Sequence, residues 1–138
     1  GIDGQKMSKS YDNTIPIFDD SELIRKKVMK IKTDTTEIDK PKNINTPLFK
    51  LYSLFLDNTE KKDLKLRFET PGMRYGDIKL DLFSKLMDYF SPYRKKREQF
   101  LNNPSDVMDI LDMGAKKAQN SANKVLEKVR TATGISFK

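Results

Sequence analysis

The sequence predicts an all-α fold, a helical bundle preceded by an extended amino-terminal loop. Apolar residues recur at spacings of three and four along most of the chain, and no stretch alternates convincingly between apolar and polar residues. Hydrophobic residues make up 36% and charged residues 34% of the sequence, a balance that favours a helix-rich fold with a well-hydrated surface. The length of 138 residues allows one small domain with a real core and is too short for two sizeable ones.

Residues 1–20 are predicted to form the loop, because Gly, Asp, Asn and Pro are dense there and no helical period holds. A first helix is expected to follow, with Asp19 or Ser21 as its cap. It should end near residues 33–36. Its stripe is expected to contain Leu23, Ile24, Lys27, Val28 and Ile31.

Residues 40–47 are predicted to be a connector, because Pro41, Pro47 and their polar neighbours break any regular element. Pro47 also fits the first turn of a second helix. Asn58 or Thr59 is expected to cap a short third helix through residue 68. The apolar positions of the second helix are Leu48, Leu51, Tyr52, Phe55 and Leu56.

Residues 70–76 are predicted to be a turn, after which Asp77 can start the next helix. This helix is the clearest core element of the sequence. Ser91-Pro92 is expected to kink or interrupt it. Its apolar residues recur every four positions at Ile78, Leu82, Leu86 and Phe90.

Asn103, Pro104 and Asp106 predict the start of a last long helix, since a cap, a first-turn proline and an early carboxylate stand in the preferred order. Gly134 is expected to end this helix. Its small residues are expected to pack closely against neighbouring helices. The stripe consists of Ala115, Ala118, Ala122, Val125, Val129 and Ala132.

The composition restricts the chemistry that the chain can carry. It contains no cysteine and no histidine, which excludes disulfides, thiolate zinc sites, cysteine nucleophiles and Ser-His triads within it. The absence of cysteine fits a cytoplasmic protein, and no apolar run approaches the roughly 20 residues that span a bilayer. A net charge of +7 indicates an anionic partner such as a nucleotide or RNA, unless it reflects a general preference for lysine.

The pentapeptide Lys6-Met7-Ser8-Lys9-Ser10 is the strongest candidate site, and we expect no metal ligands among its residues. Two lysines three residues apart, interleaved with hydroxyls, form a flexible cationic loop suited to a polyphosphate. A lysine ammonium is a compact charge with three donors, so a pair can follow negative charge that moves between phosphate oxygens. Spacing alone would also fit a solvated loop.

The exact order of residues resembles a known family. Gly-Ile-Asp-Gly-Gln-Lys-Met-Ser-Lys-Ser, at residues 1–10, is similar to the KMSKS signature of class I aminoacyl-tRNA synthetases for Tyr and Trp. Further stretches, in register along the chain, look like bacterial tryptophanyl-tRNA synthetases. These stretches are residues 26–35, Tyr75-Gly76-Asp77, Tyr89-Phe90-Ser91-Pro92-Tyr93-Arg94, Gly114-Ala115-Lys116-Lys117-Ala118 and Val129-Arg130.

The resemblance implies a two-step reaction. Tryptophan attacks the α-phosphate of ATP, which Mg²⁺ accompanies, and the acyl group then passes to the 3′ end of tRNA(Trp). It implies that Lys6 and Lys9 approach the pyrophosphate part of ATP as the catalytic pair. Met7 is expected near the adenine through its backbone, while Ser8 and Ser10 offer donors to phosphate.

The resemblance also divides the chain into a KMSKS ATP-binding loop segment, residues 1–20, and a carboxy-terminal helical domain that helps recognise the anticodon, residues 21–138. It places the start of the chain just before the ATP loop, so the catalytic α/β half and most of the tryptophan pocket are expected upstream. The chain alone is then expected to be inactive, and the intact enzyme a homodimer in the cytoplasm. The basic cluster Arg94, Lys95, Lys96 and Arg97 is either a tRNA contact or a solvated helix face.

Two alternatives stay open at this stage. A tyrosyl-tRNA synthetase shares the signature, and amino-acid dependence separates it from a tryptophanyl enzyme. A non-catalytic helical RNA-binding module would retain the loop only as a relic. An upstream half with a His-containing phosphate signature would argue against that module.

Overall fold

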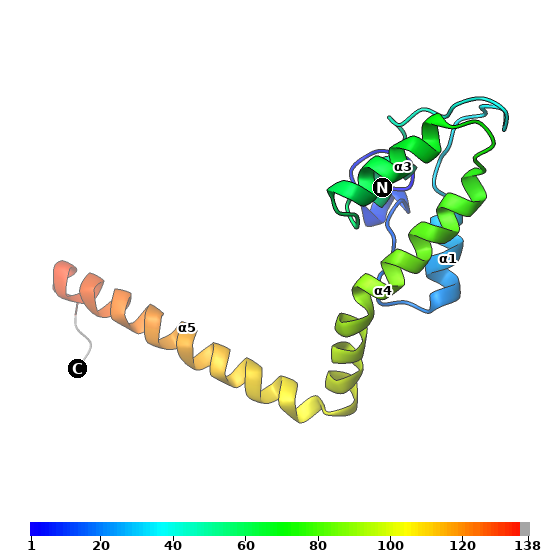
Figure 1. Ribbon diagram of the computed structural model, residues 1–138. Coiled ribbons are helices and arrows are strands. Elements are labelled where there is room, and N and C mark those ends of the chain that lie inside the picture. Colours follow the sequence, from blue (N-terminus) through cyan, green and yellow to red (C-terminus); the bar gives the residue numbers. More distant parts are fainter. Residues whose placement is uncertain (136–138) are drawn as a thin grey trace. The chain divides into compact units, whose positions relative to one another are not determined.

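The computed structural model describes residues 1–135, in which every regular element is helical and no β-strand occurs, as the sequence predicts (Figure 1). The chain divides into two compact units, Gly1–Arg94 (the first unit) and Lys95–Lys138 (the second unit). In chain order the elements are the 3-10 turn η1 (Lys9–Tyr11) and the helices α1 (Ser21–Met29), α2 (Pro47–Ser53), α3 (Asn58–Glu69), α4 (Tyr75–Asn102) and α5 (Pro104–Thr133).

The core lies in the first unit and is built from α1 to α4. Full burial of one aliphatic or aromatic side chain in this core contributes roughly 1.5–3 kcal/mol to the stability of the fold. The predicted stripe of α4 is confirmed at three positions, and its fourth member, Phe90, is half-buried against the same cluster. Leu23, which we placed on the α1 stripe, is exposed instead. The buried cluster consists of Ile24, Val28, Ile31, Leu48, Tyr52, Leu64, Phe68, Ile78, Leu82 and Leu86.

The helices α1, α2 and α3 begin with side-chain caps, and two of these caps lie at residues that the prediction missed. The carboxylate of Asp20, not Asp19 or Ser21, accepts from the Glu22 amide at 2.8 Å. Asp57 rather than Asn58 or Thr59 caps α3, in a capping box with Glu60. A cap must sit one position before the first helical residue for its oxygen to reach the free amides.

The amino end of α2 confirms its predicted start. Pro47 is the first residue of the helix, and the Thr46 hydroxyl caps it by accepting from the Phe49 amide at 3.3 Å. α4 begins at Tyr75, two residues earlier than predicted, and Asp77 lies in its first turn, paired with Arg74.

Pro92 lies inside α4 and does not interrupt it, since the helix continues to Asn102. A proline in a helix removes one N–H donor and crowds the carbonyl four residues earlier. The helix is continuous on both sides of Pro92, so the predicted interruption is wrong, while the predicted kink stays a prediction.

α5 begins and ends as predicted, and the residues of its apolar stripe are exposed. Pro104 is its first residue, and Gly134 ends it in the left-handed region with a φ of 70°. Asn103 stands at the cap position, yet its side chain makes no cap hydrogen bond. No residue of α5 is buried, and the close packing of its alanine stripe against neighbouring helices stays a prediction. Periodicity shows which face is apolar and does not show that a partner is present.

None of the helices in residues 1–135 has both the length and the apolar character needed to cross a membrane.

Candidate functional site

The KMSKS loop, Lys6–Ser10, lies at the surface of the first unit and has a defined backbone path. The Ser8 hydroxyl accepts from the Ser10 amide at 3.3 Å and so starts the turn η1. The Asp12 amide then closes this turn on the Lys9 carbonyl at 3.2 Å. Asp12 itself has a positive φ of 49°, a conformation that Asp and Asn adopt more readily than most residues. The loop therefore ends in a tight turn rather than an open segment.

Asn13 is the buried polar contact of this loop, with 2% of its surface exposed. Its Nδ2 donates to the Lys6 carbonyl at 3.0 Å and to the two carboxylate oxygens of Asp3 at 3.0 and 3.2 Å. Its Oδ1 accepts from the Ser8 amide at 2.7 Å. One side chain thus holds the backbone on both sides of Met7.

The carboxylate of Asp3 is kept ionised for this contact. Hydrogen bonds from the Gln5 amide, at 3.0 Å, and from the Asn13 side chain outweigh the effect of desolvation and lower the pKa of Asp3. At neutral pH the Asn13 amide therefore always faces an acceptor with a full charge.

The base of the loop is tied to α1 and to the residues that follow it. Lys27 of α1 donates to the Asp12 carbonyl at 3.0 Å and forms an ion pair with the Asp12 carboxylate. The hydrogen bond and charge of Lys27 lower the pKa of Asp12. On the other side, Ile2 donates to the Asn13 carbonyl at 3.0 Å and accepts from the Lys32 amide at 2.7 Å.

Gly4 brings the start of the loop against α2. Its φ of 89° is strained for any residue with a side chain, and an added Cβ would lie only 3.0 Å from Cγ of Pro47. A glycine here allows the segment before the KMSKS loop to approach the amino end of α2 closely.

The two signature lysines are exposed and available. Within residues 1–135, neither the Lys6 nor the Lys9 ammonium takes part in an ion pair or a hydrogen bond. Lys27, by contrast, is committed to Asp12. The ammonium groups of Lys6 and Lys9 are therefore free to bind a ligand, whereas that of Lys27 holds the loop in place.

Arg94 is half-buried and hydrogen-bonded, unlike the exposed lysines of the predicted basic cluster. Its Nη1 donates to the Ile17 carbonyl at 2.7 Å and to the Asp19 carbonyl at 2.9 Å, and so holds the segment between the KMSKS loop and α1. Its neighbours Lys95, Lys96 and Arg97 belong to the second unit and are exposed.

Aromatic rings accompany the basic cluster. Tyr93 is 56% exposed, and its ring stacks on Tyr89 with centroids 6.4 Å apart. It is therefore not the buried core anchor that such a residue usually forms. In the second unit, the Lys96 ammonium lies over the Phe100 ring at 4.8 Å.

Lys42 anchors a second polar network, which the sequence did not reveal. Its ammonium donates to the carbonyls of Thr36 and Glu37 and lies over the Tyr75 ring at 5.7 Å. The Tyr75 hydroxyl donates to the Asp34 carboxylate at 2.7 Å. Burial and this contact raise the pKa of Tyr75 well above its ordinary value. The network shapes the connector before α2 and is structural.

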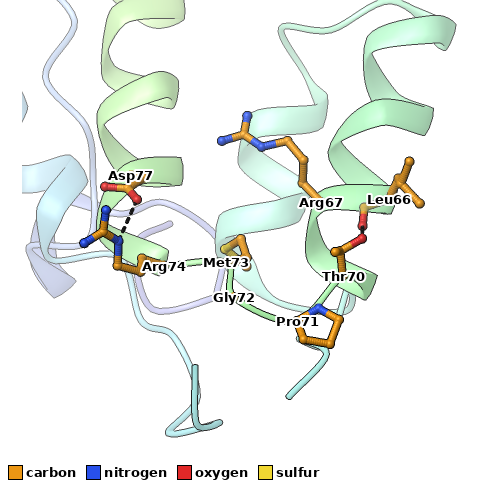
Figure 2. Close-up of a pocket in the computed structure, with 8 residues that line it drawn as sticks. All are labelled: Leu66, Arg67, Thr70, Pro71, Gly72, Met73, Arg74 and Asp77. Atoms are coloured by element: carbon orange, nitrogen blue, oxygen red, sulfur yellow. Dashed lines mark hydrogen bonds and ion pairs between the residues drawn. The ribbon is translucent and has the colours of Figure 1, made fainter. Parts of the chain in front are cut away.

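A hollow of about 340 Å³ lies between the end of α3 and the start of α4 (Figure 2). Its two guanidinium groups are already neutralised, since Arg67 bonds to Asp81 at 2.8 Å and Arg74 to Asp77 at 3.0 Å. It contains none of the predicted site residues. The residues that line it are Leu66, Arg67, Thr70, Pro71, Gly72, Met73, Arg74 and Asp77.

The structure identifies loop anchors that the sequence reasoning missed, namely Asn13, Asp3 and Lys27. No spacing rule links an asparagine to a carboxylate ten residues earlier, so only the folded loop shows the contact. In the part of the chain that the structure describes, no group of three or more acidic residues could hold a metal ion. The exposed cationic loop therefore remains the candidate site.

Comparison with known proteins gives one family. The family model for class I tRNA synthetases (W and Y) matches residues 1–91. Tryptophan--tRNA ligase from Campylobacter jejuni is 40% identical over 136 residues, which is 98% of this chain and 43% of that protein. The corresponding ligase from Fusobacterium nucleatum is 38% identical over 135 residues, 98% of this chain and 42% of that protein.

A solved structure agrees with the sequence comparison. The crystal structure of tryptophanyl-tRNA synthetase from Campylobacter jejuni, complexed with ADP and tryptophan, matches with a TM-score of 0.90 at 40% identity. The match covers 98% of this chain and 43% of that one. The chain thus spans less than half the length of these relatives.

Proposed function

The chain belongs to the class I tRNA synthetases of the W and Y family, and on that premise we propose that it forms part of a tryptophan--tRNA ligase. Relatives with that name at 38–40% identity, along nearly the entire chain, support tryptophan over tyrosine. Because the chain spans less than half of these relatives, the proposal concerns its contribution to a longer enzyme. A tyrosyl enzyme is the nearest alternative.

The proposed reaction needs positioned positive charge more than covalent chemistry. The carboxylate of tryptophan attacks the α-phosphate of ATP, which enters with Mg²⁺, and pyrophosphate leaves as negative charge builds on it. The acyl group of the adenylate then passes to the 3′ end of tRNA. In phosphoryl transfers of this kind, most of the rate comes from alignment and from cations matched to the transition state.

The observation that carries the proposal is that the backbone of the KMSKS loop is anchored by hydrogen bonds to Asn13, while the ammonium groups of Lys6 and Lys9 are unpaired within residues 1–135. We assign Lys6 and Lys9 to the leaving pyrophosphate. The Ser8 amide is already bound to Asn13, so Ser8 would act through its hydroxyl hydrogen, which stays free while the oxygen accepts from Ser10. Met7 would approach the adenine through its backbone.

The helical part, residues 21–138, would bind tRNA(Trp). Lys95, Lys96 and Arg97 are the exposed cations of the cluster, and the exposed ring of Tyr93 could stack on an unpaired base. We keep Arg94 in this set, although its guanidinium also holds the loop segment before α1. Charge reversal at Lys95 and Lys96 should raise the KM for tRNA, and an unchanged KM would leave these residues as a solvated face.

The test of the loop is Lys9→Ala in the complete enzyme, measured by tryptophan-dependent pyrophosphate exchange. Removing one preorganised cation should lower kcat by roughly 10²- to 10³-fold. Lys62→Ala removes an equal charge from the exposed face of α3 and should leave the rate unchanged. If only the KM for ATP rose, Lys9 would bind the ground state alone, and the transition-state role would be wrong.

We also propose that residues 1–138 alone form no adenylate, because they supply the ATP loop, residues 1–20, and the tRNA-binding helices but no histidine-based phosphate site. Exchange above background from this chain would overturn that statement. Exchange that depends on tyrosine in the complete enzyme would favour the tyrosyl alternative. The complete enzyme is expected to be a cytoplasmic homodimer, with the tryptophan pocket mostly outside this span.

A further inference from the structure

Among the described residues, only Asn13 has a side chain that forms hydrogen bonds with the KMSKS backbone on both sides of Met7. It spans the Lys6 carbonyl and the Ser8 amide at 3.0 and 2.7 Å. Both donors and the acceptor of the amide are used, because its other contact is Asp3. It is also almost fully buried, which makes each of these bonds costly to leave unmade.

The chemistry of this position selects asparagine. Aspartate would offer no donor to the Lys6 carbonyl and would place a second negative charge against Asp3. Alanine would leave the Ser8 amide and the Lys6 carbonyl without a partner. All side-chain bonds of Asn13 go to Asp3, Lys6 and Ser8, so they fix the loop segment rather than the packing of the helices.

We propose that Asn13 is a positioning residue for the polyphosphate loop, which sets the backbone on both sides of Met7 so that Lys6 and Lys9 are presented together. This inference rests on the proposed function of the loop. A loop that must be ordered on binding pays a conformational cost, and a preformed one avoids it. Loss of Asn13 should therefore weaken polyphosphate binding without removing either lysine.

The first experiment needs no ligand. In the ¹⁵N-labelled chain, Asn13→Ala should speed hydrogen exchange of the Ser8 amide by about tenfold, the scale for losing one hydrogen bond. Asn123→Ala is the matched control, since Asn123 is exposed on α5, and it should leave Ser8 unchanged. Unchanged Ser8 exchange in Asn13→Ala would overturn the proposal.

The second experiment uses inorganic pyrophosphate as the probe and follows the amide resonances of residues 6–10. Asn13→Ala should weaken the site-resolved affinity by about tenfold, while Asn123→Ala should not change it. If neither the unaltered chain nor the complete enzyme shows a shift at these residues, the polyphosphate role of the loop is wrong. The Ser8 exchange rates still decide whether Asn13 fixes the backbone.

The double substitution Asp3→Asn with Asn13→Asp distinguishes an effect on the position of the loop from an effect on the stability of the fold. The pair keeps the net charge, the bond between residues 3 and 13, and an acceptor for the Ser8 amide, but it leaves the Lys6 carbonyl facing a carboxylate. The exchanged pair should recover part of the thermal midpoint that Asn13→Ala loses, because it restores the contacts to residue 3 and to the Ser8 amide, and it should still bind pyrophosphate about tenfold more weakly. Recovery of both properties would show a merely structural role and overturn the proposal.

Discussion

The two units of the chain use the same kind of helical pattern with different results. In α4 the apolar residues Ile78, Leu82 and Leu86 are buried, whereas in α5 an equally regular stripe that includes Ala118 and Val125 leaves every residue unburied. The difference lies in what faces the stripe. α4 meets α1 to α3 within the first unit, and α5 buries no residue in this chain. A regular apolar stripe thus depends on the sequence of one helix, whereas its burial depends on the presence of a second element that packs against it.

The largest expected contrast comes from cutting one leucine in each unit. Leu82→Ala removes a side chain that is 0% exposed and should lower the free energy of unfolding by about 2–5 kcal/mol. Leu111→Ala removes a side chain on α5 that is 59% exposed and should cost less than about 0.5 kcal/mol. Urea denaturation followed by circular dichroism measures both. Equal losses would show that Leu111 is buried in solution.

A second contrast concerns two lysines near the connector before α2. Lys42→Met leaves the Thr36 and Glu37 carbonyls without their charged donor, so the free energy of unfolding should fall by about 2 kcal/mol. Lys40→Met, two residues away, removes only an exposed ion pair with Glu37 and should cost less than about 0.5 kcal/mol. Thermal and urea unfolding of the two variants give the comparison. Similar stabilities would mean that the buried ammonium contributes nothing net.

Helix caps provide a smaller test of the same comparison. Thr46→Ala removes a cap hydrogen bond at the start of α2 and should cost about 1 kcal/mol. Asn103→Ala at the start of α5 removes no cap hydrogen bond, and its effect should stay below about 0.5 kcal/mol. Helix content by circular dichroism and the urea midpoint would show the difference. A larger loss at Asn103 would contradict the cap assignment.

The smallest effect should come from the ion pair at the base of the KMSKS loop. Lys27 lowers the pKa of Asp12 below its ordinary value of 3.8. The ion pair therefore stabilises the loop fully at pH values above 3.8, and this stabilisation is lost as the pH falls through the lowered pKa of the folded chain. Lys27→Met should raise the pKa of Asp12 toward 3.8, and Lys26→Met should not. Titration of the Asp12 carboxyl by NMR distinguishes the two variants. An unmoved Asp12 pKa would show that the pair is absent in solution.

The sequence was sufficient where local rules decide. Pro47, Gly134 and the Ile78 stripe were read correctly because a proline ring, a left-handed glycine and a four-residue period each act within one turn or one helix. The caps at Asp20 and Asp57 were missed by one residue, because adjacent polar residues are equally plausible until the first helical turn is fixed.

The supports of the site could not be predicted in the same way. The KMSKS signature located the cationic loop, yet nothing in the order of residues connects Asn13 with Asp3, or Arg94 with the carbonyl of Ile17, 77 positions away. Such contacts depend on how distant segments meet. The roles of the lysines toward ATP remain predictions, because they depend on a ligand and on the rest of the enzyme.

The buried state of Lys42 has a practical consequence for chemical labelling. Among residues 1–135 it is the most deeply buried lysine, with 5% of its surface exposed. An amine-reactive acylating reagent should therefore modify the other lysines of the folded chain first and reach this one only when the first unit opens. Mass spectrometry of the peptide that contains Lys42 would then report how readily the first unit opens.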